Sequence, residues 1–288
     1  MKKLLYQLDT DPIPSTFDNV VAYDGGADQV TALGGIDPRN VGALVDGAIF
    51  TRAPKDKKFT ALFIGGGNMS AGETLLEMIK KRFFAGFRVS VMLDSNGSNT
   101  TAAAAVAWMG ASASLAGKRC VVLAGTGPVG MRAAYMLARE GAQVGVSSRT
   151  VERAQSACRA LKERFGVEVA PLEGATAEQR AASIQGAHFV LSTGAAGAQL
   201  LKEQDWRESR TLELLSDANA TPPAGIEGID VMDKATVRHG KKVFGAIGFG
   251  ALKIALHRAC IARLFEANDL VLDAEQIYEM AKTMVGKT

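Results

Sequence analysis

The sequence has few cysteines, no long apolar run and no concentrated block of one charge. Its three cysteines, Cys120, Cys158 and Cys260, lie far apart and form no C-x-x-C pair. This argues against a disulfide framework and against a zinc site, so we expect no metal and a reducing, cytoplasmic location. The alanine-rich run at 102–109 is far too short to span a membrane, and the apolar stretch at the N-terminus is too short for a signal peptide.

The charge is nearly balanced, with 33 Lys and Arg against 30 Asp and Glu, which gives a net charge of +3. No basic patch alternates with aromatic residues, so nucleic acid is not an expected partner. The mild positive balance suits an anionic small molecule. The densest basic cluster, Lys55-Asp56-Lys57-Lys58, is interpreted as a solvated loop.

Glycine is abundant, with 31 residues, and many glycines separate apolar runs. Strand-like and helix-like segments alternate almost throughout, which predicts an α/β fold with parallel sheets. A break near 113–118 divides the chain into an α/β substrate domain at 1–112 and a Rossmann-type domain at 113–250. Helices at 251–288 are predicted to return to the first domain and close a cleft between the two. A further helix is predicted at 200–208, and the Gly- and Pro-containing region 221–250 is assigned no helix or strand.

The segment RCVVLAGTGPVGMR at 119–132 contains the spacing G-x-G-x-x-G between a strand and a helix. In this context the first glycine allows a tight turn, the second lets a pyrophosphate approach, and the third lets the helix pack on the strand. The exposed N–H groups of the helix then face the anion. The predicted dinucleotide-binding residues of this loop are Gly125, Thr126, Gly127, Pro128, Val129 and Gly130.

The end of the next strand indicates which dinucleotide binds. NAD sites usually have Asp or Glu there, but this chain has Ser148, Arg149 and Thr150, with Arg153 one helical turn later. A carboxylate would repel a ribose 2′-phosphate, whereas guanidinium groups offer it forked, charge-assisted hydrogen bonds. These residues therefore predict NADP as the cofactor.

Ligands of open α/β sheets gather at the carboxyl ends of the strands, which predicts the remaining site residues. On the nicotinamide side of the cofactor these are Ser192, Thr193, Ala195, Asp217 and Ala218. For the substrate they are Asn68, Asp94, Asn96, Asn99, Asn219 and Phe249. Lys253, placed at the start of the helix across the cleft, and Asp94 are the candidate catalytic residues. The three histidines, at positions 188, 239 and 257, are interpreted as structural.

Five motifs together resemble a known family: FIGGGN at 63–68, LDSNGSN at 93–99, AGTGPVG at 124–130, DANATPP at 217–223 and GAIGFGALK at 245–253. The chain resembles the NADP-dependent methylene-tetrahydromethanopterin/methylene-tetrahydrofolate dehydrogenases of methylotrophic bacteria over nearly its whole length. The resemblance implies oxidation of a methylene-tetrahydropterin to the methenyl form in one-carbon metabolism. It also implies a homo-oligomer, with a trimer as one option.

Two alternatives stay open from the residues alone. One is another NADP oxidoreductase of the shikimate dehydrogenase or glutamyl-tRNA reductase type, because the stretch SRTVERA at 148–154 is similar to one found in shikimate dehydrogenases. The other is an NADPH-binding regulator without catalytic activity. The bifunctional folate enzymes carry a Tyr-x-x-x-Lys pair in their first domain, and no such pair occurs in the first domain here. The pair Tyr278 and Lys282 has this spacing but is interpreted as part of an ordinary amphipathic helix.

Overall fold

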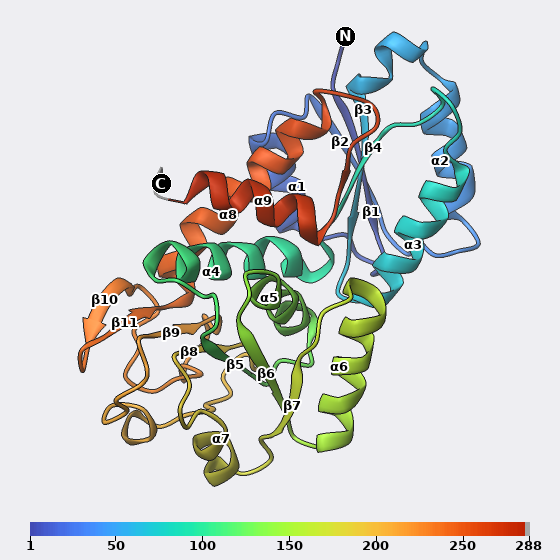
Figure 1. The fold of residues 1–288 in the computed structure, drawn as a ribbon. Coiled ribbons are helices and arrows are strands. Elements are labelled where there is room, and N and C mark those ends of the chain that lie inside the picture. Colours follow the sequence, from blue (N-terminus) through green and yellow to red (C-terminus); the bar gives the residue numbers. More distant parts are fainter. Residues whose placement is uncertain (286–288) are drawn as a thin grey trace. The chain divides into compact units, whose positions relative to one another are not determined.

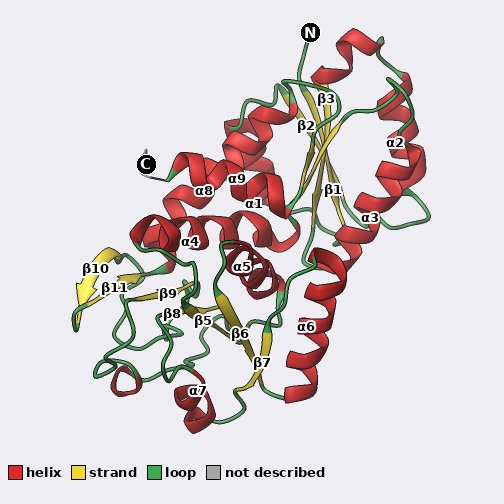
Figure 2. Ribbon diagram, viewed as in Figure 1, coloured by secondary structure: helices red, strands yellow, loops and turns green. Residues whose placement is uncertain are grey.

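The computed structural model describes residues 1–285 and consists of two compact units (Figures 1 and 2). The first contains residues 1–100 and 254–283, and residues 101–253 form the body of the second. The sequence placed the domain boundaries at 112 and 250. The chain instead passes from unit to unit inside two continuous helices, α4 (Ser98–Ser112) and α8 (Ala246–Leu264).

The first unit is a five-stranded, wholly parallel sheet in the order β12-β4-β3-β1-β2. Helices α2 and α3 cover one face and helices α1 and α9 the other (Figure 1). The buried aliphatic side chains of β1, β3 and β4 form a core against α2 and α3. The elements are β1 (Leu4–Asp9), α1 (Thr16–Asp24), β2 (Gln29–Leu33), α2 (Val41–Phe50), β3 (Thr60–Gly65), α3 (Met69–Arg82), β4 (Ser90–Leu93), β12 (Val271–Leu272) and α9 (Ala274–Met284).

The short strand β12 brings the C-terminal segment back to the first unit. Val271 and Leu272 pair with Val91 and Met92 of β4, so the last strand of the chain completes the first sheet. This confirms the predicted return of the C-terminal segment to the first domain. The sequence did not predict β12 itself, because two residues are too few to show a strand pattern.

The second unit is a seven-stranded sheet in the order β10-β11-β9-β8-β5-β6-β7, in which only β10 runs antiparallel to its neighbour. The six parallel strands have the doubly wound order of a Rossmann domain, which confirms the predicted fold class. The elements are β5 (Arg119–Leu123), α5 (Pro128–Arg139), β6 (Gln143–Ser148), α6 (Val151–Phe165), β7 (Ala170–Glu173), α7 (Ala177–Ser183), β8 (Phe189–Ser192), β9 (Leu214–Asp217), β10 (Lys234–Arg238) and β11 (Lys241–Phe244).

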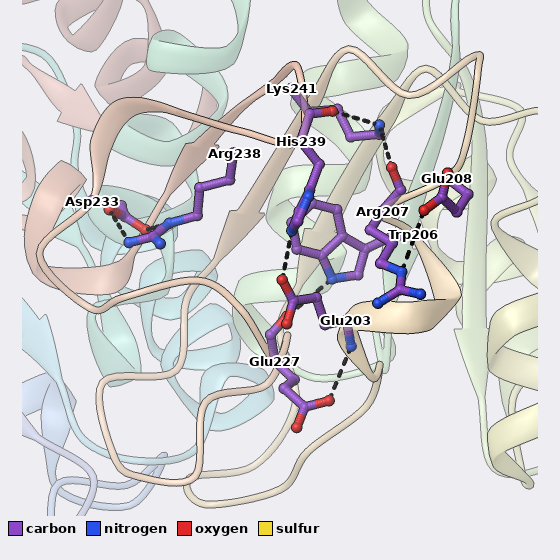
Figure 3. A network of polar contacts seen from close by, with 9 residues as sticks. All are labelled: Glu203, Trp206, Arg207, Glu208, Glu227, Asp233, Arg238, His239 and Lys241. Carbon is purple, nitrogen blue, oxygen red and sulfur yellow. Dashed lines mark hydrogen bonds and ion pairs between the residues drawn. The ribbon is translucent and has the colours of Figure 1, made fainter.

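The predicted helix at 200–208 is wrong, because this segment forms only a short 3₁₀ turn, Glu203–Asp205. Tertiary contacts outweigh its helical propensity. The fully buried Trp206 donates its indole N–H to the carbonyl of Glu227, and His239 contacts both Trp206 and the Glu203 carboxylate (Figure 3). His239 lies in the turn of the β10–β11 hairpin, in the region 221–250 to which the sequence analysis assigns no strand.

Helix α8 begins at Ala246 and not at 251 as predicted. Lys253 therefore lies two turns inside the helix instead of at its start. The difference arises because the glycines at 245, 248 and 250 look like loop residues in the sequence. In the structure, a Cβ at Gly245 or Gly248 would lie within 2.1 Å of a backbone oxygen of the 230–233 segment, so close packing requires these glycines at the start of the helix.

The interpretation of 55–58 as a solvated loop is wrong for Lys57, whose side chain is fully buried. Its ammonium group donates to the carbonyls of Ile49 and Arg52, at the C-terminal end of α2, and lies 4.7 Å from the centre of the Phe87 ring. Burial lowers the pKa of this ammonium group. Lys57 thus satisfies carbonyls that a helix end leaves without partners.

We expect Lys57→Met to lower the free energy of unfolding of the first unit by about 2–3 kcal/mol, because it removes two charge-assisted hydrogen bonds to buried carbonyls. The measurement is urea denaturation followed by circular dichroism. Lys58→Met is the matched control, since Lys58 is exposed and its loss should change stability by about 0.5 kcal/mol or less. Equal stability of the two variants would contradict the structural role of Lys57.

Within residues 1–285, no helix combines the length and the apolar character that crossing a membrane requires. The same residues contain no group of three His, Cys, Asp or Glu side chains arranged to hold a metal ion.

Candidate functional site

The glycine loop between β5 and α5 has three glycines with different surroundings. A Cβ at Gly125 would lie 2.8 Å from a methyl carbon of Val122, and one at Gly130 would lie 2.4 Å from the Cα of Gly125. These two positions therefore require glycine for close packing of the loop on the strand and of the helix on the loop. At Gly127 a Cβ would meet no atom within 4 Å. Gly127 thus faces open space directly before the helix.

Helix α5 offers an anion-binding end at this loop. Gly127 is the N-cap residue, Pro128 occupies the first helical position, and the first turn contains no acidic residue. The N–H groups of Val129 and Gly130 lie in this first turn, where a helix provides no internal acceptor and its dipole favours negative charge. Together with the open space at Gly127, this arrangement fits the pyrophosphate of a dinucleotide.

Two neighbouring strands hold the loop in place. The hydroxyl of Ser147 on β6 accepts the N–H of Ala124 at 3.1 Å, and its carbonyl accepts the N–H of Gly125 at 3.0 Å. On the other side, Thr193 donates both its N–H and its hydroxyl to the carbonyl of Leu123 at 3.0 Å. Ser147 was not among the predicted site residues. Its signal in the sequence is a small hydroxyl residue at the end of the strand that follows the loop.

Two exposed arginines follow β6, Arg149 directly after the strand and Arg153 in the first turn of α6. Among the residues that the structure describes, neither guanidinium group has an ion-pair partner. Thr150 between them is the N-cap of α6 and accepts the backbone N–H of Arg153, so this hydroxyl is already used locally. Ser148 is buried. This edge of the sheet therefore presents two positive charges that no carboxylate of the described residues neutralises.

Ser192 and Asp217 end the neighbouring strands β8 and β9 in direct register, and both are buried. The Asp217 carboxylate accepts the N–H groups of Asn219 and Ile226. Burial raises the pKa of this carboxyl, and its hydrogen bonds act in the opposite direction. Ala218 donates its N–H to the carbonyl of Ser192. Asp217 therefore organises the loop at this edge.

Asn219 and Phe249, the two residues of the second unit predicted to contact the substrate, instead form contacts within the protein. The amide oxygen of Asn219 accepts the N–H of Thr221 and, at 3.4 Å, that of Gly197, and its amide nitrogen donates to the carbonyl of Pro223. Phe249 is buried with 2% of its surface exposed. The predicted cofactor residue Ala195 is exposed, and the predicted catalytic residue Lys253 is half-buried.

In the first unit, the predicted residues lie in loops at the carboxyl ends of β3 and β4. Asp94 is fully buried. Its carboxylate accepts the N–H groups of Asn99 and Thr100 at 2.8 and 3.1 Å and the hydroxyl of Thr100 at 2.6 Å. These contacts fix the start of α4 to the end of β4. They favour a positioning role for Asp94 over the predicted catalytic one, because the carboxylate is neither exposed nor short of donors.

The loops after β1, β3 and β4 are tied to one another. Asp11 accepts the N–H of Gly67 at 2.8 Å. The carbonyl of Gly66 accepts the N–H of Asn96 at 2.7 Å, and the carbonyl of Gly65 accepts the hydroxyl of Ser95 at 3.1 Å. This edge of the sheet is therefore a connected set of loops rather than three independent ones.

An aromatic group next to this edge was missed by the sequence reading. His257 of α8 is fully buried and stacks on Phe63 of β3, with ring centres 5.4 Å apart, and Phe17 of α1 lies 6.5 Å from it. Phe17 leaves 47% of its surface exposed. Nothing in the sequence brings positions 17, 63 and 257 together, because their proximity comes from the return of the C-terminal segment.

The Tyr278 and Lys282 pair lies in α9 as expected. Tyr278 is buried, and Lys282 lies over its ring and forms an ion pair with Glu279. These contacts agree with the structural reading of this pair.

Comparisons with known proteins identify relatives over the whole chain. The family described as "Methylene-tetrahydromethanopterin dehydrogenase, N-terminal" matches residues 16–96. The bifunctional protein MdtA of Methylorubrum extorquens is 55% identical over 285 residues, which cover 98% of this chain and 99% of that protein. The NAD(P)-dependent methylenetetrahydromethanopterin dehydrogenase of the same organism is 36% identical and covers 99% of each chain.

Among solved structures, quinate dehydrogenase from Corynebacterium glutamicum in complex with NAD resembles this chain with a TM-score of 0.57. The match covers 97% of this chain and 98% of that one at 14% identity. At this identity the likeness concerns the fold alone, a small α/β unit combined with a Rossmann unit.

Proposed function

Because the chain belongs to the methylene-tetrahydromethanopterin dehydrogenase family, we propose that it oxidises methylene-tetrahydromethanopterin to the methenyl form with NADP as the hydride acceptor. The membership confirms the resemblance read from the sequence motifs. The structural observation that carries the proposal is the glycine loop with open space at Gly127, together with Arg149 and Arg153 after β6, which form no ion pair with any described residue.

Binding of a nicotinamide dinucleotide is supported by the family and by the fit of the loop, and NADP is our narrower proposal. The 2′-phosphate of NADP carries about two negative charges and suits two forked donors. NAD would leave the two guanidinium groups facing a neutral hydroxyl. The relative at 36% identity is named NAD(P)-dependent, so the arginine pair is the feature of this chain that favours NADP.

The residues of this chain bind and orient the reactants rather than transfer protons. Loss of a hydride from an N–CH₂–N group leaves a cation that the two pterin nitrogens stabilise themselves, so no protein base is needed. Bound NADP supplies the hydride acceptor. The first turn of α5 would hold its pyrophosphate, and the tied loops at 65–68 and 94–99 would hold the pterin, which makes positioning the main contribution of the protein.

We extend the proposal to methylene-tetrahydrofolate as a second substrate, since both pterins share the reacting group. A homo-oligomer in the cytoplasm is the setting that the family resemblance favours. The test is an absorbance assay of the purified protein with both methylene-pterins and both nicotinamide dinucleotides. We expect NADPH formation with at least methylene-tetrahydromethanopterin. Tight NADPH binding without turnover of either pterin would instead indicate a regulator.

We also expect no useful hydrolysis of the methenyl product. General-base assistance is worth roughly 10²–10⁴-fold, and the Tyr-x-x-x-Lys pair that supports this step in the bifunctional folate enzymes has no counterpart within residues 1–112. The pair Tyr278 and Lys282 lies in α9, where Tyr278 is buried. The measurement is the decay of methenyl-tetrahydrofolate without nucleotide. A rate well above that of buffer would reveal a base that we have not identified.

A further inference from the structure

The four asparagines predicted to contact the substrate differ in how far the protein already uses their side chains. Asn68 is the N-cap of α3, and its amide oxygen accepts the N–H of Ala71. Asn99 is buried, and its amide nitrogen donates to Leu93 and Asp273. Both amide atoms of Asn219 are engaged with backbone groups of its own loop and of Gly197. These three residues hold loops and helix ends in place.

Asn96 is different, because it is exposed and its side-chain amide makes no hydrogen bond to any described residue. Its backbone is left-handed, with φ 57° and ψ 21°. Asparagine tolerates this conformation better than most residues, but it is still unusual outside turns. The N–H of Asn96 donates to Gly66 at 2.7 Å, so the residue is held in place through its backbone while its amide stays available.

Hydrogen bonds of the neighbouring residues hold the backbone around Asn96 in place. The carbonyl of Asp94 accepts the N–H of Gly97 at 2.9 Å, and the carboxylate of Asp94 anchors the start of α4. Ser95 donates its hydroxyl to Gly65. The backbone of Asn96 is thus held on both sides, and little backbone freedom remains to be lost when a ligand binds.

We propose that Asn96 is the residue that recognises the pterin ring, through a pair of hydrogen bonds to its amino–oxo edge. This inference rests on the proposed function. A carboxamide carries one acceptor and two donors in one plane, which matches the adjacent donor and acceptor of that edge. The edge is common to tetrahydromethanopterin and tetrahydrofolate, so Asn96 contributes equally to both and does not choose between them.

The test uses two variants that separate the side chain from the backbone. Asn96→Gly keeps the left-handed conformation and removes the amide, and Asn96→Asp keeps the shape but replaces the donor with a charged acceptor. We expect the pterin KM of both to rise about 10-fold, the loss of two neutral hydrogen bonds, for either pterin. The NADP KM and the pH profile should stay within about twofold, since cofactor binding does not involve this residue.

Asn268→Asp is the matched control, because Asn268 contacts the carbonyl of Arg88 before β4, at the other end of that strand from Asn96, and its pterin KM should not change. A second readout is competition by a tetrahydropterin that lacks the exocyclic amino group. It should bind the wild type about 10-fold more weakly than the parent pterin, and the Asn96→Gly variant about equally with it.

An unchanged pterin KM in Asn96→Gly would overturn the inference, as would undiminished discrimination against the analogue by that variant. Equal rises of the pterin and NADP KM would also overturn it, because they would show a general loss of structure. Failure of the proposed function looks different, since in that case the wild-type protein itself would not oxidise either methylene-pterin.

Discussion

Gly127→Val is expected to abolish binding of the nicotinamide dinucleotide while leaving the protein folded. The added side chain would meet no protein atom within 4 Å of its Cβ, and the backbone conformation of φ −84° and ψ 174° is open to valine. It would instead fill the space before α5 in which the pyrophosphate is proposed to bind. We expect Kd for NADPH to rise about 100-fold or more, equivalent to about 2.8 kcal/mol.

The measurement is fluorescence titration with NADPH, with circular dichroism to verify the fold. Gly47→Val is the matched control, because Gly47 is an exposed glycine of α2 whose Cβ would also meet no atom within 4 Å. It should bind NADPH normally. If folded Gly127→Val retained the affinity of the wild type, the dinucleotide site would have to lie elsewhere.

Arg149→Asp combined with Arg153→Ala is expected to weaken NADP binding strongly and NAD binding little. Each lost charge-assisted contact to a 2′-phosphate costs about 1.5–3 kcal/mol, or about 10- to 100-fold in affinity. The new carboxylate at 149 adds repulsion of the phosphate and can accept the ribose hydroxyl of NAD. The cap of α6 should survive, because Thr150 accepts the backbone N–H of residue 153 and not its side chain.

Steady-state KM values for the two nucleotides provide the measurement. Arg159→Ala tests for a general effect of charge, since Arg159 is an exposed arginine of the same helix whose guanidinium group donates to the hydroxyl of Ser156. This variant should behave as the wild type towards both nucleotides. A double variant whose NADP KM stayed unchanged would disprove the assignment of the arginine pair.

The fold was predictable where patterns are local. Alternating strands and helices, together with the glycine loop, were enough to predict two α/β units and the Rossmann order. The errors fall where distant residues decide the local structure. Trp206 and His239 hold the 200–208 segment out of a helix, and Lys57 is buried by Ile49 and Phe87. Propensity cannot report such contacts, because both partners have to be placed first.

For the site, the sequence could identify polar residues but could not show which of their side chains already form hydrogen bonds within the protein. Asp94, Asn99 and Asn96 look alike as polar residues after a strand. The structure separates them by burial and by hydrogen bonds, and only Asn96 keeps its side chain available. The stacking of His257 on Phe63 had no local signal at all, since 194 residues separate the two positions, from 63 to 257.

The pairing of β12 with β4 has a consequence for the synthesis of the protein. Residues 101–253 emerge from the ribosome before Val271 and Leu272 do, so the second unit can fold while the sheet of the first unit still lacks its last strand. Until then, β4 exposes an open edge whose four residues are all buried in the finished protein. Such an edge is a template for pairing with other chains. We therefore expect chains that stop before position 271 to aggregate, although they contain all the predicted nucleotide-binding residues.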